Sequence, residues 1–461
     1  MMSAQPPSRN LTERFAECIL ALRYDTLPPQ AIEMAKQVTL DGLAVILAGA
    51  TEPSGLGAIV KRYVQEMGGA PDATVITGGG KTSMPNAAFA NGTMAHALDF
   101  DNTWYPLNHP TSPTLPAILA VAEKYGSPGS AIIEAIATAF EVQARIRLAA
   151  VGLVTGEGFH KPGTTGMMGA TAAVAKLLGL DRDRLVMALG IAGSRAGSLS
   201  INTGTMTKSS HSGHAARMGV ECGILAAMGW TANHDVFGKG GFFDVFMADA
   251  EPELLLKDFA RPLRMVDPGV GFKKHPCNYF THRPIDAALA LRSEHAIDPA
   301  QIARVQVLFP RFDYVDRPLP ATGLDGKFSV QYATALALLD GEITVDTFTD
   351  ARRFAADVVE FLPRVRMIVD ETIPFDFEKM HAEVAVILRD GRSLTKRVKE
   401  FSGFVGFPLT RQQRLDKFYG CARRVIDKAR ADRVLVLVES LETLPDIREI
   451  LDLLRDPSPG L

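Results

Sequence analysis

Apolar residues recur at helical spacing along most of the first 260 residues of the chain. The pattern predicts helices at residues 14–24, 28–47, 113–125, 130–153, 166–180, 183–192 and 208–228. A short strand-like piece at residues 73–77 interrupts them. Pro28 and Pro29 suit the first turn of a helix, where the missing N–H group costs little. This part of the chain therefore favours a helical domain.

The pattern changes after about residue 266. Alternating apolar and polar residues predict strands at 305–309, 365–370, 382–388 and 395–399, with a hairpin turn at Asp390–Gly391 between the last two. Helices at 284–294 and 328–340 accompany them, and helical spacing returns from residue 410. We predict a mainly α protein of two domains. Residues 1–265 and 405–461 form an all-α helical domain, and residues 266–404 form a smaller α+β lid domain.

Composition narrows the class of protein. The chain has 461 residues, 47% of them hydrophobic, and a net charge of −3, so it has no general attraction for nucleic acid or membranes. The cysteines, Cys18, Cys222, Cys277 and Cys421, lie far apart, which is atypical of a disulfide framework or a zinc site. We expect no signal peptide. We also expect no membrane-spanning segment, because no apolar run approaches the length of about 18 residues that such a segment needs. We predict a cytoplasmic protein that acts on a small molecule.

One short segment concentrates polar side chains that can move protons. Asp99, Asp101, Thr103 and His109 supply two carboxylates, a hydroxyl and an imidazole within eleven residues. These groups suit proton transfer to or from a carbon acid. We predict that His109 is the acid/base, oriented by Asp99 and Thr103, because a catalytic base needs an orienting partner. Asp101 and nearby His96 are expected to be structural.

Two further loops offer groups that can bind an anion. Lys208 stands in a polar Gly/Thr loop at the predicted start of a helix, where the helix dipole disfavours a cation. A lysine in that place is a candidate ligand for an anion. His160 lies in a Gly/Pro loop with two threonines before another helix, where N–H groups can bind an anion. An interhelical turn with a surface histidine fits the same residues.

A basic stretch opens the predicted lid domain. Its polar and reactive residues are Lys273, Lys274, His275, Cys277, His282 and Arg283. Aromatic residues interleave with the cations, so part of the stretch should be buried. Charge-assisted bonds to carboxylates are strong, and we predict that His282 and one of Lys273 or Lys274 join Lys208 in binding a substrate's carboxylates. Cys277 is expected to be a buried thiol rather than a nucleophile.

Two other interpretations fit less well. Gly78–Gly80 followed by Lys81 resembles a phosphate loop, but that motif needs a glycine at position 75, which is Val75. A glycine-rich turn is the better interpretation. His96, Asp99 and Asp101 could ligate a metal, and so could His211 and His214, which share a helix face, yet no further ligand follows at a recognisable spacing. We therefore predict neither a phosphate loop nor a metal site.

With these residues the chain resembles the MmgE/PrpD family, which contains 2-methylcitrate dehydratases, cis-aconitate decarboxylases and an iminodisuccinate epimerase. The resemblance is carried by residues 91–92, 96–101, 103, 109–110, 158–160, 206–208, 213–217, 273–286 and 328–332. It implies a helical domain formed by both ends of the chain, a smaller α+β lid, and no cofactor. It also implies a homodimer or larger homo-oligomer.

Within the family, residues 314–320 look most like the cis-aconitate decarboxylase branch. The active-site set that this likeness implies is Asp99, Thr103, His109, His160, Lys208, His282 and Tyr314. Two positions depart from the family pattern. Asn102 stands where many members have an aspartate. The Lys-Lys-His-Pro-Cys run at 273–277 replaces the usual Lys-x-Tyr-Pro-x-Cys, so the likeness does not choose between its two lysines.

These observations favour a cofactor-independent lyase that acts on a small di- or tricarboxylate. Decarboxylation of cis-aconitate or a close analogue is the first hypothesis, with His160 and Tyr314 as a second proton donor and a positioning group. A 2-methylcitrate-type dehydratase, and an epimerase of an imino- or amino-linked dicarboxylate such as iminodisuccinate, need nearly the same groups. A non-catalytic carboxylate-binding protein is the fourth hypothesis.

Overall fold

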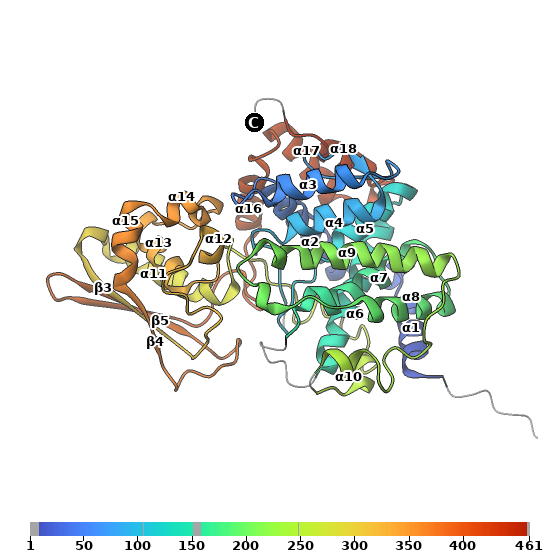
Figure 1. Cartoon of the computed structure of the whole chain (residues 1–461), viewed down its shortest axis with the longest axis horizontal. Coiled ribbons are helices and arrows are strands. Elements are labelled where there is room, and N and C mark those ends of the chain that lie inside the picture. The colour runs from blue at the N-terminus through green and yellow to red at the C-terminus, as the bar shows by residue number, and fades with distance from the viewer. Residues whose placement is uncertain (1–8, 105, 151–157, 248, 459–461) are drawn as a thin grey trace, which may run out of the picture.

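The computed structural model describes residues 9–104, 106–150, 158–247 and 249–458. Most of the chain is helical, and a small mixed sheet of four strands lies with its own helices to one side of the larger helical part (Figure 1). This agrees with the predicted mainly α class. Among the described residues, no helix is both long enough and apolar enough to cross a membrane.

The larger helical part contains most of the predicted helices, with ends shifted by a few residues. The helices that match predicted ranges are α1 (Leu11–Ala21), α2 (Pro29–Gly49), α5 (Leu115–Tyr125), α6 (Gly129–Ala149), α7 (Met167–Leu177), α8 (Arg182–Arg195) and α9 (Met206–Ala227). The helical part also contains α3 (Leu56–Met67), α4 (Met84–Ala95) and α10 (Phe242–Phe246). The predicted extension of α6 to residue 153 falls outside the described residues. Our sequence analysis missed α3, although Leu56, Val60 and Val64 recur every four residues and are buried.

The C-terminal helices return to the helical part, as the spacing from residue 410 predicts. They are α16 (Arg411–Ala422), α17 (Lys428–Glu439) and α18 (Arg448–Leu454), and α16 and α17 pack against α2. Cys421 and Val434 lie in the same hydrophobic cluster as Leu47. Both ends of the chain therefore share one core.

A glycine turn in the helical part is confirmed. Strands β1 (Ala73–Thr74) and β2 (Lys81–Thr82) form an antiparallel hairpin, so the strand predicted at 73–77 is shorter and has a partner that we did not predict. Gly78 and Gly80 have positive φ angles of 90° and 66°, which glycine adopts without strain. This hairpin also means that the helical part is not strictly all-α.

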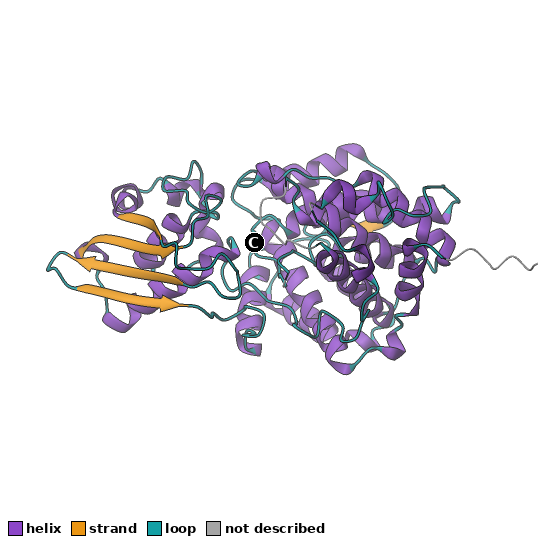
Figure 2. Ribbon diagram, turned by 90° about the horizontal axis from the view of Figure 1, so that it is seen from below, coloured by secondary structure: helices purple, strands orange, loops and turns teal. Residues whose placement is uncertain are grey.

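The four-stranded sheet has the order β4-β3-β5-β6. Strand β3 (Ile302–Phe309) is parallel to β4 (Val365–Val369) and antiparallel to β5 (Ala382–Leu388), which pairs in turn with β6 (Ser393–Val398) (Figure 2). Alternate residues of β5 are buried, as a strand with one covered face requires. The hairpin turn predicted between β5 and β6 is confirmed, with Gly391 at a φ of 88°.

The remaining helices belong with this sheet. They are α11 (His282–His295), α12 (Gly323–Gly326), α13 (Val330–Asp340), α14 (Asp350–Arg353) and α15 (Ala356–Phe361). Side chains of α11 and α13 join those of the sheet in a hydrophobic cluster whose fully buried members all lie between residues 277 and 405. The range is close to the predicted lid of residues 266–404, whose limits stay a prediction. We call this unit the α+β part.

Candidate active site

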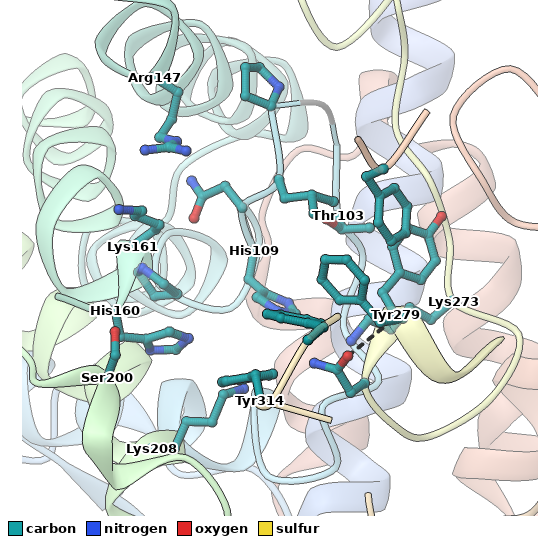
Figure 3. A pocket seen from close by; sticks show the side chains of 18 of the residues that line it. Thr103, His109, Arg147, His160, Lys161, Ser200, Lys208, Lys273, Tyr279 and Tyr314 are labelled. Carbon is teal, nitrogen blue, oxygen red and sulfur yellow. Dashed lines mark hydrogen bonds between the residues drawn. The ribbon is translucent and has the colours of Figure 1, made fainter. Parts of the chain in front are cut away.

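A cavity of about 510 Å³ collects residues from both parts of the molecule (Figure 3). Its basic and polar lining includes Thr103, Asn108, His109, Arg147, His160, Lys161, Ser200, Lys208, Lys273, Asn278 and Asp376. Aromatic and aliphatic side chains complete the lining. Six of the predicted site residues therefore line it: Thr103, His109, His160, Lys208, Lys273 and Tyr314.

Helices α4 and α9 position the acidic and basic centre of the site. They cross in close contact where Gly92 faces the backbone of Gly213. Lys208 begins α9, and Asp99 follows the end of α4 in a left-handed conformation with a φ of 49°. Aspartate tolerates that conformation better than most residues. The close crossing brings the Asp99 carboxylate and the Lys208 ammonium group together, although they are far apart in sequence.

Asp99 lies between two ammonium groups. Lys273 Nζ is 2.7 Å from Asp99 Oδ2, and Lys208 Nζ donates to Asp99 Oδ1. All three side chains are buried. Burial alone would raise the pKa of Asp99, but Lys208 and Lys273 outweigh it and hold that pKa well below its ordinary value. The three groups together carry one net positive charge.

The contacts of His109 differ from our prediction. Its Nδ1 is 3.1 Å from Asp101 Oδ2, whereas its Nε2 is 3.8 Å from Asp99 Oδ1. Asp101 therefore contacts His109 more closely than Asp99 does, although we expected Asp101 to be structural. The Thr103 hydroxyl donates to the carbonyl of Trp104 at 3.4 Å. The sequence alone does not show that His109 contacts Asp101, because Asp99 turns its side chain towards the lysines.

Asp101 also holds His96, which lies behind His109. His96 Nδ1 is 2.9 Å from Asp101 Oδ1, and His96 Nε2 is 2.9 Å from Lys208 Nζ. Burial, opposed by Asp101, lowers the pKa of His96 to about 4. His96 is therefore neutral near pH 7 and can accept a hydrogen bond from the Lys208 ammonium group. Burial would raise the pKa of Asp101, but His109 and His96 hold it well below the ordinary value.

His160 is a cavity residue with a histidine partner. Its Nδ1 is 3.1 Å from Nδ1 of His211, so one ring donates to the other. Burial, followed by the charge of Lys208, lowers the pKa of His160 well below its ordinary value. Of its two interpretations in sequence, the surface turn is therefore wrong: the described structure places this ring in the cavity.

A metal-like geometry also occurs here. His96, Asp99 and His109 offer ligand atoms that all lie within 4.8 Å of one another. However, Lys208 Nζ is hydrogen-bonded to both His96 and Asp99. Two of the three side chains that a metal ion would need as ligands therefore already bind an ammonium group. The donor set fits an ammonium ion better than a metal ion.

The structure separates two other predicted ligands from the cavity. Lys274 is 38% exposed in its side chain and pairs with Asp286 at 3.1 Å. His282 is fully buried against the rings of Tyr279 and Phe401, and it is not among the described residues that line the cavity. Of the two adjacent lysines, only Lys273 lines the site.

Two reactive groups are unsuited to acid or nucleophile chemistry at neutral pH. Cys277 is buried, as expected, and burial raises the pKa of its thiol to about 12. Tyr314 lines the cavity and accepts a hydrogen bond from the Thr203 hydroxyl at 3.3 Å. Burial, followed by the charge of Asp99, raises the pKa of Tyr314 above its ordinary value. Tyr314 thus keeps its proton and can donate a hydrogen bond.

Sequence reasoning missed several lining residues. They include Arg147, Lys161, Ser200 and Asn278. Lys161 is adjacent to His160 and could have been found there. Arg147 lies within α6, whose helical pattern gives no sign of a cavity. In Figure 3, Arg147, Lys161, His160 and Lys208 follow one side of the cavity, and Tyr279 and Lys273 lie on the other.

Comparison with known proteins places this site in context. The MmgE/PrpD N-terminal domain model matches residues 13–255, and the MmgE/PrpD C-terminal domain model matches residues 275–443. The chain is 32% identical to the cis-aconitate decarboxylase of Homo sapiens, over 98% of this chain and 96% of that protein. The chain is 29% identical to the cis-aconitate decarboxylase of Aspergillus terreus, over 95% of this chain and 94% of that protein. It is 26% identical to the 2-methylcitrate dehydratase of Escherichia coli, over 80% of this chain and 81% of that protein.

Proposed function

We propose, from the premise that this chain belongs to the MmgE/PrpD family and is a lyase, that it decarboxylates cis-aconitate or a close analogue without a cofactor. Likeness supports decarboxylation over dehydration, since the decarboxylases match more of the chain at higher identity than the Escherichia coli dehydratase. The observation that carries the proposal is that the His109 imidazole lies next to the Asp101 carboxylate, in a cavity that is also lined by two lysines.

The reaction needs one proton and a sink for negative charge. Cis-aconitate carries one carboxylate on a saturated carbon beside its double bond. When CO₂ leaves, the C–C bond breaks and its electron pair moves through the double bond to the carbon next to another carboxylate. That carbon then takes a proton. Each turnover therefore consumes one proton and releases one CO₂.

Lys208 and Lys273 can stabilise the negative charge that develops when CO₂ leaves. Their ammonium groups converge on Asp99 and line the cavity, so a substrate carboxylate placed there gains charge-assisted hydrogen bonds. In a buried site such bonds stabilise developing negative charge more than they would in water. Asp99 keeps the two ammonium groups close and cancels only one of their two charges.

His109 is our candidate for the group that protonates the carbon. Asp101 is close to His109 Nδ1, which leaves Nε2 on the opposite edge of the ring. A carboxylate on Nδ1 orients the imidazole and stabilises its protonated form. His160 and Tyr314 reach the same cavity. We expected His160 to be a second proton donor, but its lowered pKa keeps the ring neutral, so we propose both residues as groups that position the substrate by hydrogen bonds. Residues 266–404 are proposed as a lid that excludes water when substrate is bound.

One NMR experiment tests the reaction. Purified protein is incubated in D₂O with cis-aconitate, a citrate-type hydroxy acid or an imino-linked dicarboxylate. Decarboxylation yields CO₂ and one deuterium on the new C–H carbon. Release of an alkene from the hydroxy acid, with cis-aconitate left intact, would instead identify a dehydratase. Exchange of deuterium without net loss of CO₂ or water would identify an epimerase.

A variant tests the role of His109. His109→Gln keeps a polar side chain and removes the acid/base, so kcat should fall about 10²- to 10⁴-fold. His295→Gln, at the exposed end of α11, is the control and should keep wild-type kcat. Unchanged kcat in His109→Gln would exclude His109 as the proton donor.

A further inference from the structure

The two sides of the cavity differ in apolar surface. Lys208 and His160 come from the helical part. The other side carries polar groups too, Lys273, Asn278 and Asp376, but it also presents five apolar side chains of the α+β part, which we call the apolar wall: Phe280, Phe312, Phe375, Phe377 and Met380. Three loops supply it: the segment before α11, the segment after β3, and the connection from β4 to β5.

The apolar wall extends beyond the hydrophobic core. Phe280 and Phe377 are buried members of the cluster in the α+β part, with ring centroids 4.8 Å apart. Phe312 is only partly buried, and its ring centroid is 4.9 Å from that of Phe375. Phe375 itself is 47% exposed and is not a member of that cluster. Apolar surface therefore continues from the core into the open cavity.

A compact tricarboxylate makes poor use of such a wall. Carboxylates pressed against aromatic rings lose water without gaining hydrogen bonds, which is costly. The cavity of about 510 Å³ also lies within the range of about 300–1,000 Å³ that is typical for drug-sized ligands.

We propose that the substrate is a carboxylate bearing an alkyl or aryl substituent, and that the apolar wall binds this substituent. The reacting end rests on the proposed function, with carboxylates at Lys208 and Lys273. The substituent covers Phe312 and Phe375 of the apolar wall. Each methylene group buried there should raise kcat/KM about fourfold, because burying one contributes about 0.8 kcal/mol.

A series of substrates tests the proposal. Cis-aconitate is compared with analogues that carry methyl, propyl or benzyl on either the saturated or the vinyl carbon. In one of the two positions, kcat/KM should rise along the series and exceed that of cis-aconitate at least tenfold for propyl. A decline along both series, in an enzyme that turns over cis-aconitate, would overturn the substituent site and leave the proposed function intact.

Binding tests the apolar wall independently of catalysis. Calorimetry with succinate and its 2-methyl, 2-propyl and 2-benzyl derivatives should show Kd falling along the series in wild-type protein. This holds even where no acid is decarboxylated, so failure of the reaction and failure of the substituent site are distinguishable. Equal Kd values across the series would overturn the proposal.

Matched variants locate the site. Phe375→Ala should lower the ratio of kcat/KM for the propyl analogue to that for cis-aconitate at least tenfold, and should weaken 2-propylsuccinate binding. Phe354→Ala is the control, because Phe354 is also in the α+β part and 55% exposed but does not line the cavity. It should leave both values unchanged. An unchanged ratio in Phe375→Ala would contradict the assignment of the apolar wall.

Discussion

At the scale of single residues, Asp99 controls the charge of the site. Its carboxylate accepts a hydrogen bond from Lys208 and another from Lys273, which also donates to the Asp99 carbonyl, and the Asp99 backbone is left-handed. A substrate carboxylate must therefore share the ammonium groups with Asp99 rather than find them free. Asp99 and the two lysines keep one net positive charge between them, which suits the anionic substrate and transition state of the proposed reaction.

Asp101 should matter more for proton transfer than Asp99. Asp101→Asn removes the carboxylate that lies 3.1 Å from His109 Nδ1, so the protonated imidazole loses its stabilising partner. We expect kcat to fall about 100-fold or more with a smaller change in KM, measured by steady-state CO₂ release. Asp99→Asn should act mainly on KM, through the two lysines. A larger loss of kcat in Asp99→Asn than in Asp101→Asn would restore the orienting role for Asp99.

The two adjacent lysines provide a matched pair of variants. Lys273→Met removes a buried ammonium group from the cavity and leaves Asp99 with one partner, so kcat/KM should fall about 100-fold. Lys274→Met removes a partly exposed lysine that pairs with Asp286, and kcat/KM should stay near the wild-type value. Equal losses in the two variants would contradict the assignment of Lys273, rather than Lys274, to the cavity.

At the scale of elements, the crossing of α4 and α9 determines the site's geometry. Small residues at the crossing let the two helix backbones approach, and Gly92 and Gly213 face each other there. Lys208 lies on the same helix as Gly213, somewhat more than one turn earlier. A small displacement of α9 would therefore move the ammonium group away from Asp99.

Gly213→Ala tests this crossing. A Cβ at position 213 would overlap the Thr93 hydroxyl and the Phe89 carbonyl, so the helices must separate. We expect a loss of about 1–3 kcal/mol in the free energy of unfolding, with a fall in kcat/KM, from urea titration and activity assays. Gly420→Ala on α16 is the control. Its Cβ meets nothing within 4 Å, so it should stabilise the helix by about 0.5–1 kcal/mol.

At the scale of the whole molecule, a second buried ion pair, besides Asp99–Lys273, joins the two parts. Lys327 of the α+β part donates to Glu52 of the helical part at 3.0 Å, and both side chains are almost fully buried. Lys327 also donates to the carbonyl of Ala97 at 3.1 Å, in the loop that carries Asp99. The contact between the parts is therefore also a contact that supports the active-site loop.

Glu52→Gln should destabilise this junction. Burial already lowers the pKa of Lys327, and loss of the Glu52 charge would lower it further or leave an unpaired buried cation. We expect the free energy of unfolding to fall by about 3–5 kcal/mol, measured by urea titration. Glu360→Gln, which breaks an i,i+4 pair with Arg364 and is 75% exposed, should change it by less than about 1 kcal/mol. Similar effects of the two variants would argue against a structural role for the pair.

Local patterns were sufficient for most of the elements of this protein, although α3 and β2 were missed. The alternation in β5, the hairpin at Gly391 and most helices of the helical part were predictable, because burial on one face leaves a periodic trace in the chain. The helix starting near Lys208 and the presence of His109 near two carboxylates were predictable for the same local reason. The resemblance to the MmgE/PrpD family, now matched over both domain models, was also visible in short motifs.

Only the tertiary structure decided which of these groups act on each other. Whether Asp99 or Asp101 contacts His109, and whether Lys273 or Lys274 enters the cavity, depends on angles and distances between elements far apart in sequence. Arg147 and the apolar wall have no linear signal, because a residue that lines a cavity has the same helical or strand pattern as one that fills a core. The periodicity of the sequence shows which face of a helix or strand is buried. Only the packing of the elements determines which residues lie opposite that face.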